Sequence, residues 1–166
     1  MKPLLTLFFA LLALVAQAQA PALPTDSLTG KIIYRGIVSL PAGVTQAQAF
    51  GRAKIWLADA FANKTILAED ASSGLLSGWG TVLVKDFTYL FRVRLQIESS
   101  AVRYRVDNFS FSYLDQFRST VTGTPEEQRD SKLGIGKGTR TKMLAEMDKK
   151  VKAGIAQLST ELAGVL

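Results

Sequence analysis

The chain has 166 residues, with 20 Lys and Arg residues against 14 Asp and Glu residues, a formal net charge of +6 and 48% hydrophobic residues. This composition is ordinary for a globular domain and excludes low-complexity disorder and a polytopic membrane protein. The chain contains no Cys and no His. Disulfides, thiolate or imidazole metal ligands, cysteine nucleophiles and histidine-based catalytic triads are therefore excluded. The modest positive charge favours acidic partners.

Residues 1–18 have the three parts of a secretory signal peptide. Lys2 supplies the positive start, and residues 4–15 are apolar except for Thr6. An Ala-Gln-Ala sequence at 16–18 then places small residues at the two positions that signal peptidase reads. The apolar run is shorter than the roughly 20 residues that a membrane-spanning helix needs. We therefore expect cleavage after Ala18, no transmembrane span in the product, and a periplasmic or secreted location.

The segment after the leader begins with residues 19–29, which contain two prolines and several short polar residues and predict a flexible lead-in. β-branched and aromatic residues at 31–40 predict a strand. Thr45 and Gln48 have the spacing of a capping box at the start of a helix. Apolar residues recur at intervals of three and four through 45–61, so this segment predicts a helix with one buried stripe.

Four further strands are expected at 65–69, 75–84, 87–98 and 101–113. The turns between them are short, so neighbouring strands should be antiparallel. Residues 114–138 are polar, and we interpret them as an irregular loop with room for a short helix near 115–120. Residues 139–163 carry an apolar stripe opposite a basic side and predict a second helix.

The expected order of elements is β-α-β-β-β-β-α, in one α+β domain that covers residues 30–166. Each helix has only one apolar stripe, and each strand has only one apolar face. Both helices should therefore cover the same face of a curved antiparallel sheet.

Four stretches of sequence carry a resemblance to a known family. They read GKIIY at 30–34, RAKIWLA at 52–58, EDASSGLLSGWG at 69–80 and YRVDNF at 104–109. With these motifs, the chain from Gly30 to Tyr113 resembles a family of exported bacterial domains of unknown function that have a TATA-binding-protein-like (TBP-like) fold. The resemblance implies that fold and an exported location, and it supplies no catalytic residues. The expected order of elements also matches one half of the TATA-binding-protein fold.

The strand pattern predicts how 87–98 and 101–113 pair. Apolar residues alternate along both strands, and a two-residue turn at 99–100 sets apolar residues opposite one another. The apolar phase then shifts by one residue, which predicts a β-bulge near Asp107 and Asn108. The same register sets Arg94 opposite Arg105, and like charges so placed destabilise a sheet.

The outer face of the strands expected at 75–84, 87–98 and 101–113 holds the candidate binding residues. It combines apolar side chains with four arginines: Trp79, Leu83, Leu90, Arg92, Arg94, Arg103 and Arg105. Trp79 falls opposite Arg92, within reach of a cation–π contact. Two interpretations remain open. The face is either a solvated surface shielded by long arginine stems, or it binds an anionic partner such as an anionic glycan, a lipid surface or an acidic protein.

No pattern predicts a catalytic residue, a cofactor or a metal site. The glycine-rich stretch 134–139 lacks the first Gly and the Ser or Thr that a phosphate-binding loop requires. Glu69 and Asp70 are adjacent carboxylates, but neighbouring residues of a strand point to opposite faces. We expect an exported, non-catalytic binding or interaction domain, with an extracellular hydrolase that uses carboxylates as the alternative. Nucleic acid is an unlikely partner because export removes the protein from the cytosol.

Overall fold

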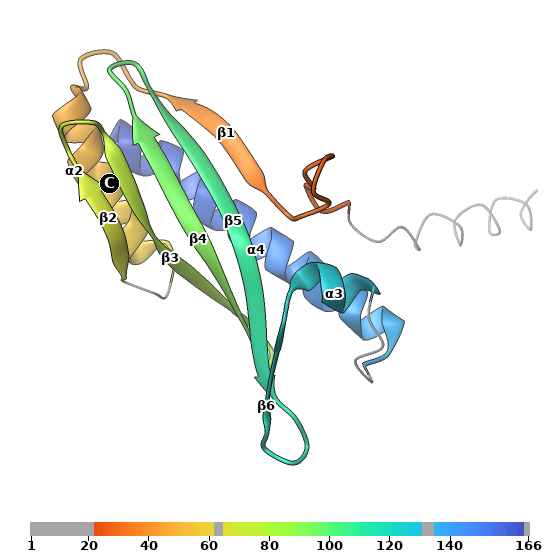
Figure 1. The fold of residues 1–166 in the computed structure, drawn as a ribbon. Coiled ribbons are helices and arrows are strands. Elements are labelled where there is room, and N and C mark those ends of the chain that lie inside the picture. Colours follow the sequence, from red (N-terminus) through yellow and green to blue (C-terminus); the bar gives the residue numbers. More distant parts are fainter. Residues whose placement is uncertain (1–21, 62–64, 131–134, 165–166) are drawn as a thin grey trace, which may run out of the picture.

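The structure is a computed structural model that describes residues 22–61, 65–130 and 135–164. The predicted leader at 1–18 lies outside the described residues. The elements, in chain order, are β1 (Tyr34–Ser39), α2 (Gln46–Asp59), β2 (Ile66–Asp70), β3 (Leu75–Val84), β4 (Phe87–Ile97), β5 (Ala101–Leu114), β6 (Thr120–Gly123), α3 (Pro125–Asp130) and α4 (Lys137–Ala163) (Figure 1). The predicted order is confirmed, with β6 and α3 added before the last helix.

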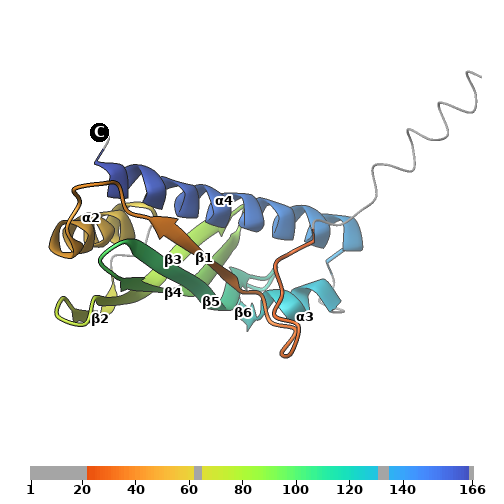
Figure 2. The same cartoon turned by 90° about the horizontal axis from the view of Figure 1, so that it is seen from above.

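The strands form one curved antiparallel sheet. Its order is β1-β5-β4-β3-β2, and β6 pairs with the far end of β5. β1 pairs along the first half of β5, where Tyr34 lies opposite Val106. Helices α2 and α4 both contact β3 and lie on one side of the sheet (Figure 2). The opposite side, which carries Arg35, Trp79, Arg92, Arg94, Arg103 and Arg105, is called the open face below.

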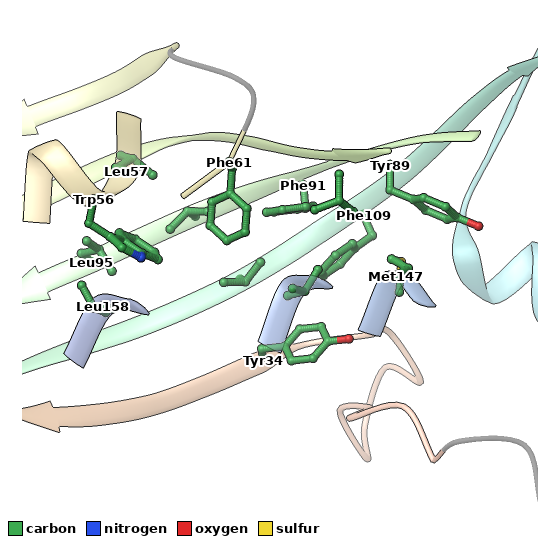
Figure 3. Packing of buried hydrophobic residues seen from close by; sticks show 14 of the residues in the cluster. Tyr34, Trp56, Leu57, Phe61, Tyr89, Phe91, Leu95, Phe109, Met147 and Leu158 are labelled. Atoms are coloured by element: carbon green, nitrogen blue, oxygen red, sulfur yellow. The ribbon is translucent and has the colours of Figure 1, made fainter. Parts of the chain in front are cut away.

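The hydrophobic core fills the space between the sheet and the two helices. The inward residues of β4 are all buried, and none is more than 7% exposed: Phe87, Tyr89, Phe91, Val93, Leu95 and Ile97. Figure 3 shows Trp56 and Phe61 reaching from the α2 side toward α4 and β4. The Phe61 ring meets the Phe91 ring edge-on at 4.9 Å between centroids. The predicted inward face of β4 is therefore confirmed.

The two long helices approach each other closely at Gly154. Trp56 of α2 donates a hydrogen bond from Nε1 to the Gly154 carbonyl at 2.8 Å. A Cβ at Gly154 would lie 2.5 Å from the Phe61 ring, so the position has no room for a larger residue. The capping box predicted at the start of α2 is confirmed, because the Thr45 side chain accepts from the Gln48 amide and the Gln48 side chain accepts from the Thr45 amide.

Helix α4 is tied to β1 by a buried polar contact. The Tyr34 hydroxyl donates to Asp148 Oδ1 at 2.9 Å, and Lys152 Nζ donates to Asp148 Oδ2 at 2.7 Å. Tyr34 is 5% exposed and Asp148 is 8% exposed. Burial, and the hydrogen bond that the phenol donates to Asp148, raise the pKa of Tyr34 well above its usual value. The phenol therefore stays protonated and serves as a structural donor.

The prediction of a flexible lead-in is wrong for residues 22–29. Residues 24–33 form a small hairpin, in which the Ile33 amide donates to the Pro24 carbonyl at 2.9 Å and the Asp26 amide donates to the Lys31 carbonyl at 2.8 Å. The Asp26 carboxylate accepts from the amides of Leu28 and Thr29 and closes the turn. Proline and short polar residues mark an ordered turn as readily as a flexible segment.

The prediction of an irregular loop at 114–138 is also wrong for its described residues. β6 extends the sheet beside the end of β5, with Tyr113 opposite Val121. Where a short helix was expected near 115–120, residues 115–119 instead form a turn closed by the Asp115 carboxylate, which accepts from two backbone amides, and β6 begins at Thr120. Residues 131–134 of the predicted loop lie outside the described residues.

Helix α3 follows β6 and packs against the sheet. Thr124 and Glu127 form a capping box, since the Glu127 amide donates to Thr124 Oγ1 and the Thr124 amide donates to Glu127 Oε2. Pro125 occupies the first helical position, where its missing N–H costs nothing. Gln128 is fully buried and accepts from the Tyr89 hydroxyl at 2.8 Å.

Candidate functional site

The open face gathers arginines from three neighbouring strands. Arg35 of β1 lies opposite Arg105 of β5, and Arg105 lies opposite Arg94 of β4. Arg103 and Arg92 lie on the same face, two residues along the strands to either side of this row. The four predicted arginines are therefore brought together. Arg35 joins them, although sequence reasoning did not include it.

The predicted register and bulge are confirmed. Arg92 pairs with both Asp107 of β5 and Trp79 of β3, so Trp79 lies opposite Arg92 as expected. The pairing of β4 with β5 shifts between Leu90 and Arg92. Asn108 has φ 56°, a left-handed conformation that lets the strand accommodate one extra residue. The bulge keeps Asp107 on the open face and returns Phe109 to the core, where it is 6% exposed.

Asp107 lies between the two opposed arginines and accepts hydrogen bonds from both. Arg94 donates from Nη2 and Arg105 donates from Nε, and both bonds go to Oδ2 of Asp107. Asp107 is only 7% exposed. We expected Arg94 and Arg105 to repel one another and destabilise the sheet. This expectation is corrected, because the carboxylate that both arginines share offsets the repulsion. The register places Asp107 opposite Arg92, but it does not determine which arginine side chains turn toward the carboxylate.

The remaining arginines of the open face are held less firmly. Arg103 pairs with Glu98 at 2.8 Å, and both side chains are about half exposed, so this ion pair contributes little to stability. Within the described part of the chain, Arg35 and Arg92 form no ion pair with a carboxylate. Arg35 is near the carboxyl of Asp26, whose pKa is lowered chiefly by hydrogen bonds from Thr29 and to a smaller extent by Arg35.

The predicted apolar residues continue the open face away from the arginine row. Leu83 is 59% exposed, while Trp79 and Leu90 are half-buried. Leu83 lies opposite Thr88, and Leu90 lies opposite Thr81 and Ser110, so the paired strand residues here are uncharged. Ile37 of β1, opposite Arg103, adds a second side chain that is 59% exposed. The face is therefore basic at one end and apolar with hydroxyl groups at the other.

A small hollow of about 330 Å³ lies beside the paired arginine and aspartate. The hairpin at 24–33 lines it with Asp26, Thr29 and Lys31, and β5 lines it with Arg105, Asp107 and Asn108. Its charges are mixed, with two cations and two carboxylates, so the hollow has no strong preference for either sign of ligand. It does leave one side of Arg105 accessible.

The carboxylates considered for catalysis have structural partners. Hydrogen bonds from the Ser72 and Ser73 side chains lower the pKa of Asp70 to about 2, and the carboxylate closes the turn between β2 and β3. Glu69 accepts from Lys54 of α2 at 2.8 Å. The two carboxylates therefore do not converge on a common site. The described residues hold no group of three or more Asp and Glu side chains that could bind a metal ion.

Two other features considered in the sequence are the glycine-rich stretch at 134–139 and the possibility of a membrane-spanning helix. Of the glycine-rich stretch 134–139, residue 134 lies outside the described residues, and the rest leads into α4, which begins at Lys137. Among the described residues, no helix combines the length and the apolar character needed to cross a membrane.

No family model matches the chain, and no curated protein matches it either. Among solved structures, it is similar to a TBP-like protein from Parabacteroides distasonis, with 12% identity and a TM-score of 0.67 over 83% of this chain and 96% of that one. It is also similar to a DUF4468 family protein from Bacteroides ovatus, with 16% identity and a TM-score of 0.58 over 81% and 90% of the two chains. Identities this low show the fold alone. The chain therefore has the TBP-like α+β fold.

Proposed function

We propose that the protein is an exported, non-catalytic binding domain whose open face binds an anionic partner. Export is supported by the signal-peptide pattern of residues 1–18. The observation that carries the binding proposal is the clustering of five arginines on a sheet face that α2 and α4 leave uncovered. Positive charge concentrated on one face attracts and orients negatively charged partners.

The charge balance of the open face supports the same conclusion. In the described part of the chain, the carboxylates beside these five arginines are Asp107, Glu98 and, from the hairpin at 24–33, Asp26, so positive charge remains in excess. Neither Arg35 nor Arg92 forms an ion pair in the described part of the chain, so their accessible donors remain for a partner. Nε of Arg92 is buried and is not one of these donors. A face that served only to shield the sheet would gain nothing from an excess of like charges.

The proposal is tested with a pair of variants that change the net charge equally. Arg35→Gln with Arg92→Gln removes two charges from the open face and leaves the Arg94–Asp107–Arg105 contact intact. Lys142→Gln with Lys149→Gln removes two charges from exposed positions of α4. Retention is measured at low salt on columns of poly-L-glutamate, of polygalacturonate and of immobilised phosphatidylglycerol vesicles.

We expect at least one column to retain the wild-type protein, and retention to fall as salt rises, because exposed charges are screened within about 10 Å at 0.1 M salt. The open-face variant should elute early, and the α4 variant should elute close to the wild type. Equal losses in the two variants would show that only net charge matters. A wild-type protein that no column retains would refute the proposal.

A further inference from the structure

We infer that the anionic partner is a protein segment that presents carboxylates, and that Asp107 positions Arg94 and Arg105 to bind one of them. This inference rests on the proposed function and names the partner for the same face. Three observations carry it: the kind of cation that the strands use, the apolar side chains beside the arginines, and the shared hydrogen-bond acceptor beneath two of them.

The strands and the long helix use different cations. The six strands of the described sheet contain five arginines and no lysine. Helix α4 contains five lysines and one arginine. A planar guanidinium can bind a carboxylate through two parallel hydrogen bonds, whereas the lysine ammonium acts as a point charge. Attraction to an anionic lipid surface is served by either cation, so the exclusive use of arginine indicates recognition of individual anionic groups.

The apolar side chains of the open face favour a protein over a polyanion of uniform charge. Ile37 and Leu83 are each 59% exposed, and Trp79 lies half-buried next to Arg92. Protein interfaces are enriched in arginine and tryptophan and depleted in lysine, and their centres bury apolar side chains. A partner that carries both carboxylates and apolar groups would complement the two halves of this face.

The spacing of arginines along β5 fits an extended acidic segment. Arg103 and Arg105 lie two residues apart and point to the same face, so they are separated by about 7 Å in a strand. Acidic residues at every second position of an extended peptide have the same separation. Such a segment, lying along β5, would bring its successive carboxylates to successive arginines.

Asp107 fixes the pair of guanidinium groups that would receive one of these carboxylates. It takes one donor from Arg94 and one from Arg105, and a guanidinium has five donors. Nε of Arg94 is buried, but other donors of both groups remain for a partner. The Arg94 and Arg105 side chains are 38% and 46% exposed, whereas the Asp107 side chain is 10% exposed and lies beneath them. Holding both groups in place before binding reduces the cost of ordering them on binding. Asp107 is therefore a positioning residue.

Removal of the Asp107 charge should strengthen peptide binding if only net charge matters, and should weaken it if Asp107 positions the two arginines. The probe is a fluorescein-labelled ten-residue peptide in which Glu alternates with Ser, and its binding to the protein is followed by fluorescence anisotropy at low salt. Asp107→Asn makes the open face more positive but replaces the shared carboxylate with a neutral amide, whose single oxygen accepts more weakly from the two guanidinium groups. Glu98→Gln is the matched control, since it makes the same change in charge and affects only the exposed pair with Arg103.

We expect Asp107→Asn to weaken peptide binding roughly tenfold, the lower end of the loss that follows removal of a residue that orients a metal ligand. Glu98→Gln should bind the peptide as tightly as the wild type, or more tightly. Equal or tighter binding by Asp107→Asn would overturn the positioning role. Arg105→Lys gives an independent test should Asp107→Asn fold poorly: it keeps the charge, so a positioned site should lose affinity and a purely electrostatic surface should not.

Further probes separate failure of this inference from failure of the proposed function. Binding to phosphatidylglycerol vesicles or to polygalacturonate, with no binding to the peptide, would overturn the inference and leave an anion-binding face. Binding to none of the three probes would overturn both. Peptide binding that is lost in Arg105→Lys and kept in Glu98→Gln would support the acidic protein segment.

Discussion

Arg94 of β4 and Arg105 of β5 lie directly opposite one another, and both donate a hydrogen bond to the same carboxylate oxygen, Oδ2 of Asp107. The pair is therefore not a case of unrelieved like-charge repulsion. Removing both arginines would leave the carboxylate of Asp107, which is 7% exposed, without its donors. A buried acceptor that loses its partners costs about 1–3 kcal/mol.

We predict that Arg94→Gln with Arg105→Gln lowers the free energy of unfolding by about 1–3 kcal/mol, measured by chemical denaturation. Adding Asp107→Asn should recover most of this loss, because the buried charge is then removed as well. Arg103→Gln is the control, and it should change stability by no more than about 0.5 kcal/mol because its pair with Glu98 is exposed. A double variant as stable as the wild type would mean that Asp107 does not need its arginines.

The two faces of the sheet should respond differently to the same substitution. Leu95 is 1% exposed and points into the core, whereas Leu83 is 59% exposed on the open face. Leu95→Asp buries an unpaired charge and should lower the free energy of unfolding by about 4 kcal/mol or more. Leu83→Asp should change it by about 0.5 kcal/mol or less. Thermal unfolding of the two variants checks the assignment, which similar melting temperatures would contradict.

The pairing of β3, β4 and β5 could be predicted from the sequence because short turns connect these strands and leave few possible registers. The partner of β1 could not be predicted in this way, since Tyr34 and Val106 are far apart in the chain and the strand could have joined either edge of the sheet. Arg35 was missed for this reason. Arg35 follows Tyr34 in the strand and so points to the opposite face, but only the pairing of β1 with β5 places it beside Arg105.

The sequence contains a local signal for α3. Thr124, Pro125 and Glu127 have the spacing of a capping box with proline at the first helical position, and they mark the start of α3. The segment is highly polar, and Pro125 and Gln128 are the buried residues of α3. It therefore lacks the apolar stripe by which the longer helices are predicted. The role of Asp107 depends on how side chains turn on one face, and strand patterning does not determine that.

Tyr34 and Asp148 provide a test of how β1 is attached to α4. Tyr34→Phe keeps the ring in the core but leaves Asp148 Oδ1 without the hydroxyl that now donates to it at 2.9 Å. We predict a loss of about 1–3 kcal/mol in the free energy of unfolding. Tyr113→Phe is the control, because the Tyr113 ring stacks on Phe87 at 4.3 Å between centroids and this contact does not need the hydroxyl. Equal effects of the two substitutions would argue against the buried hydrogen bond.

Export is the last expectation to test. The pattern at residues 1–18 predicts that signal peptidase removes the leader after Ala18, so the exported protein should begin at Gln19. Intact-mass measurement of protein recovered from the cell envelope and from the medium checks the cleavage site. Ala18→Leu replaces one of the two small residues that the peptidase reads, so this variant should keep its leader and remain associated with the membrane. Ala22→Leu lies beyond the expected cleavage site and should be processed normally. A wild-type product in the cytoplasm that still carries Met1 would contradict export.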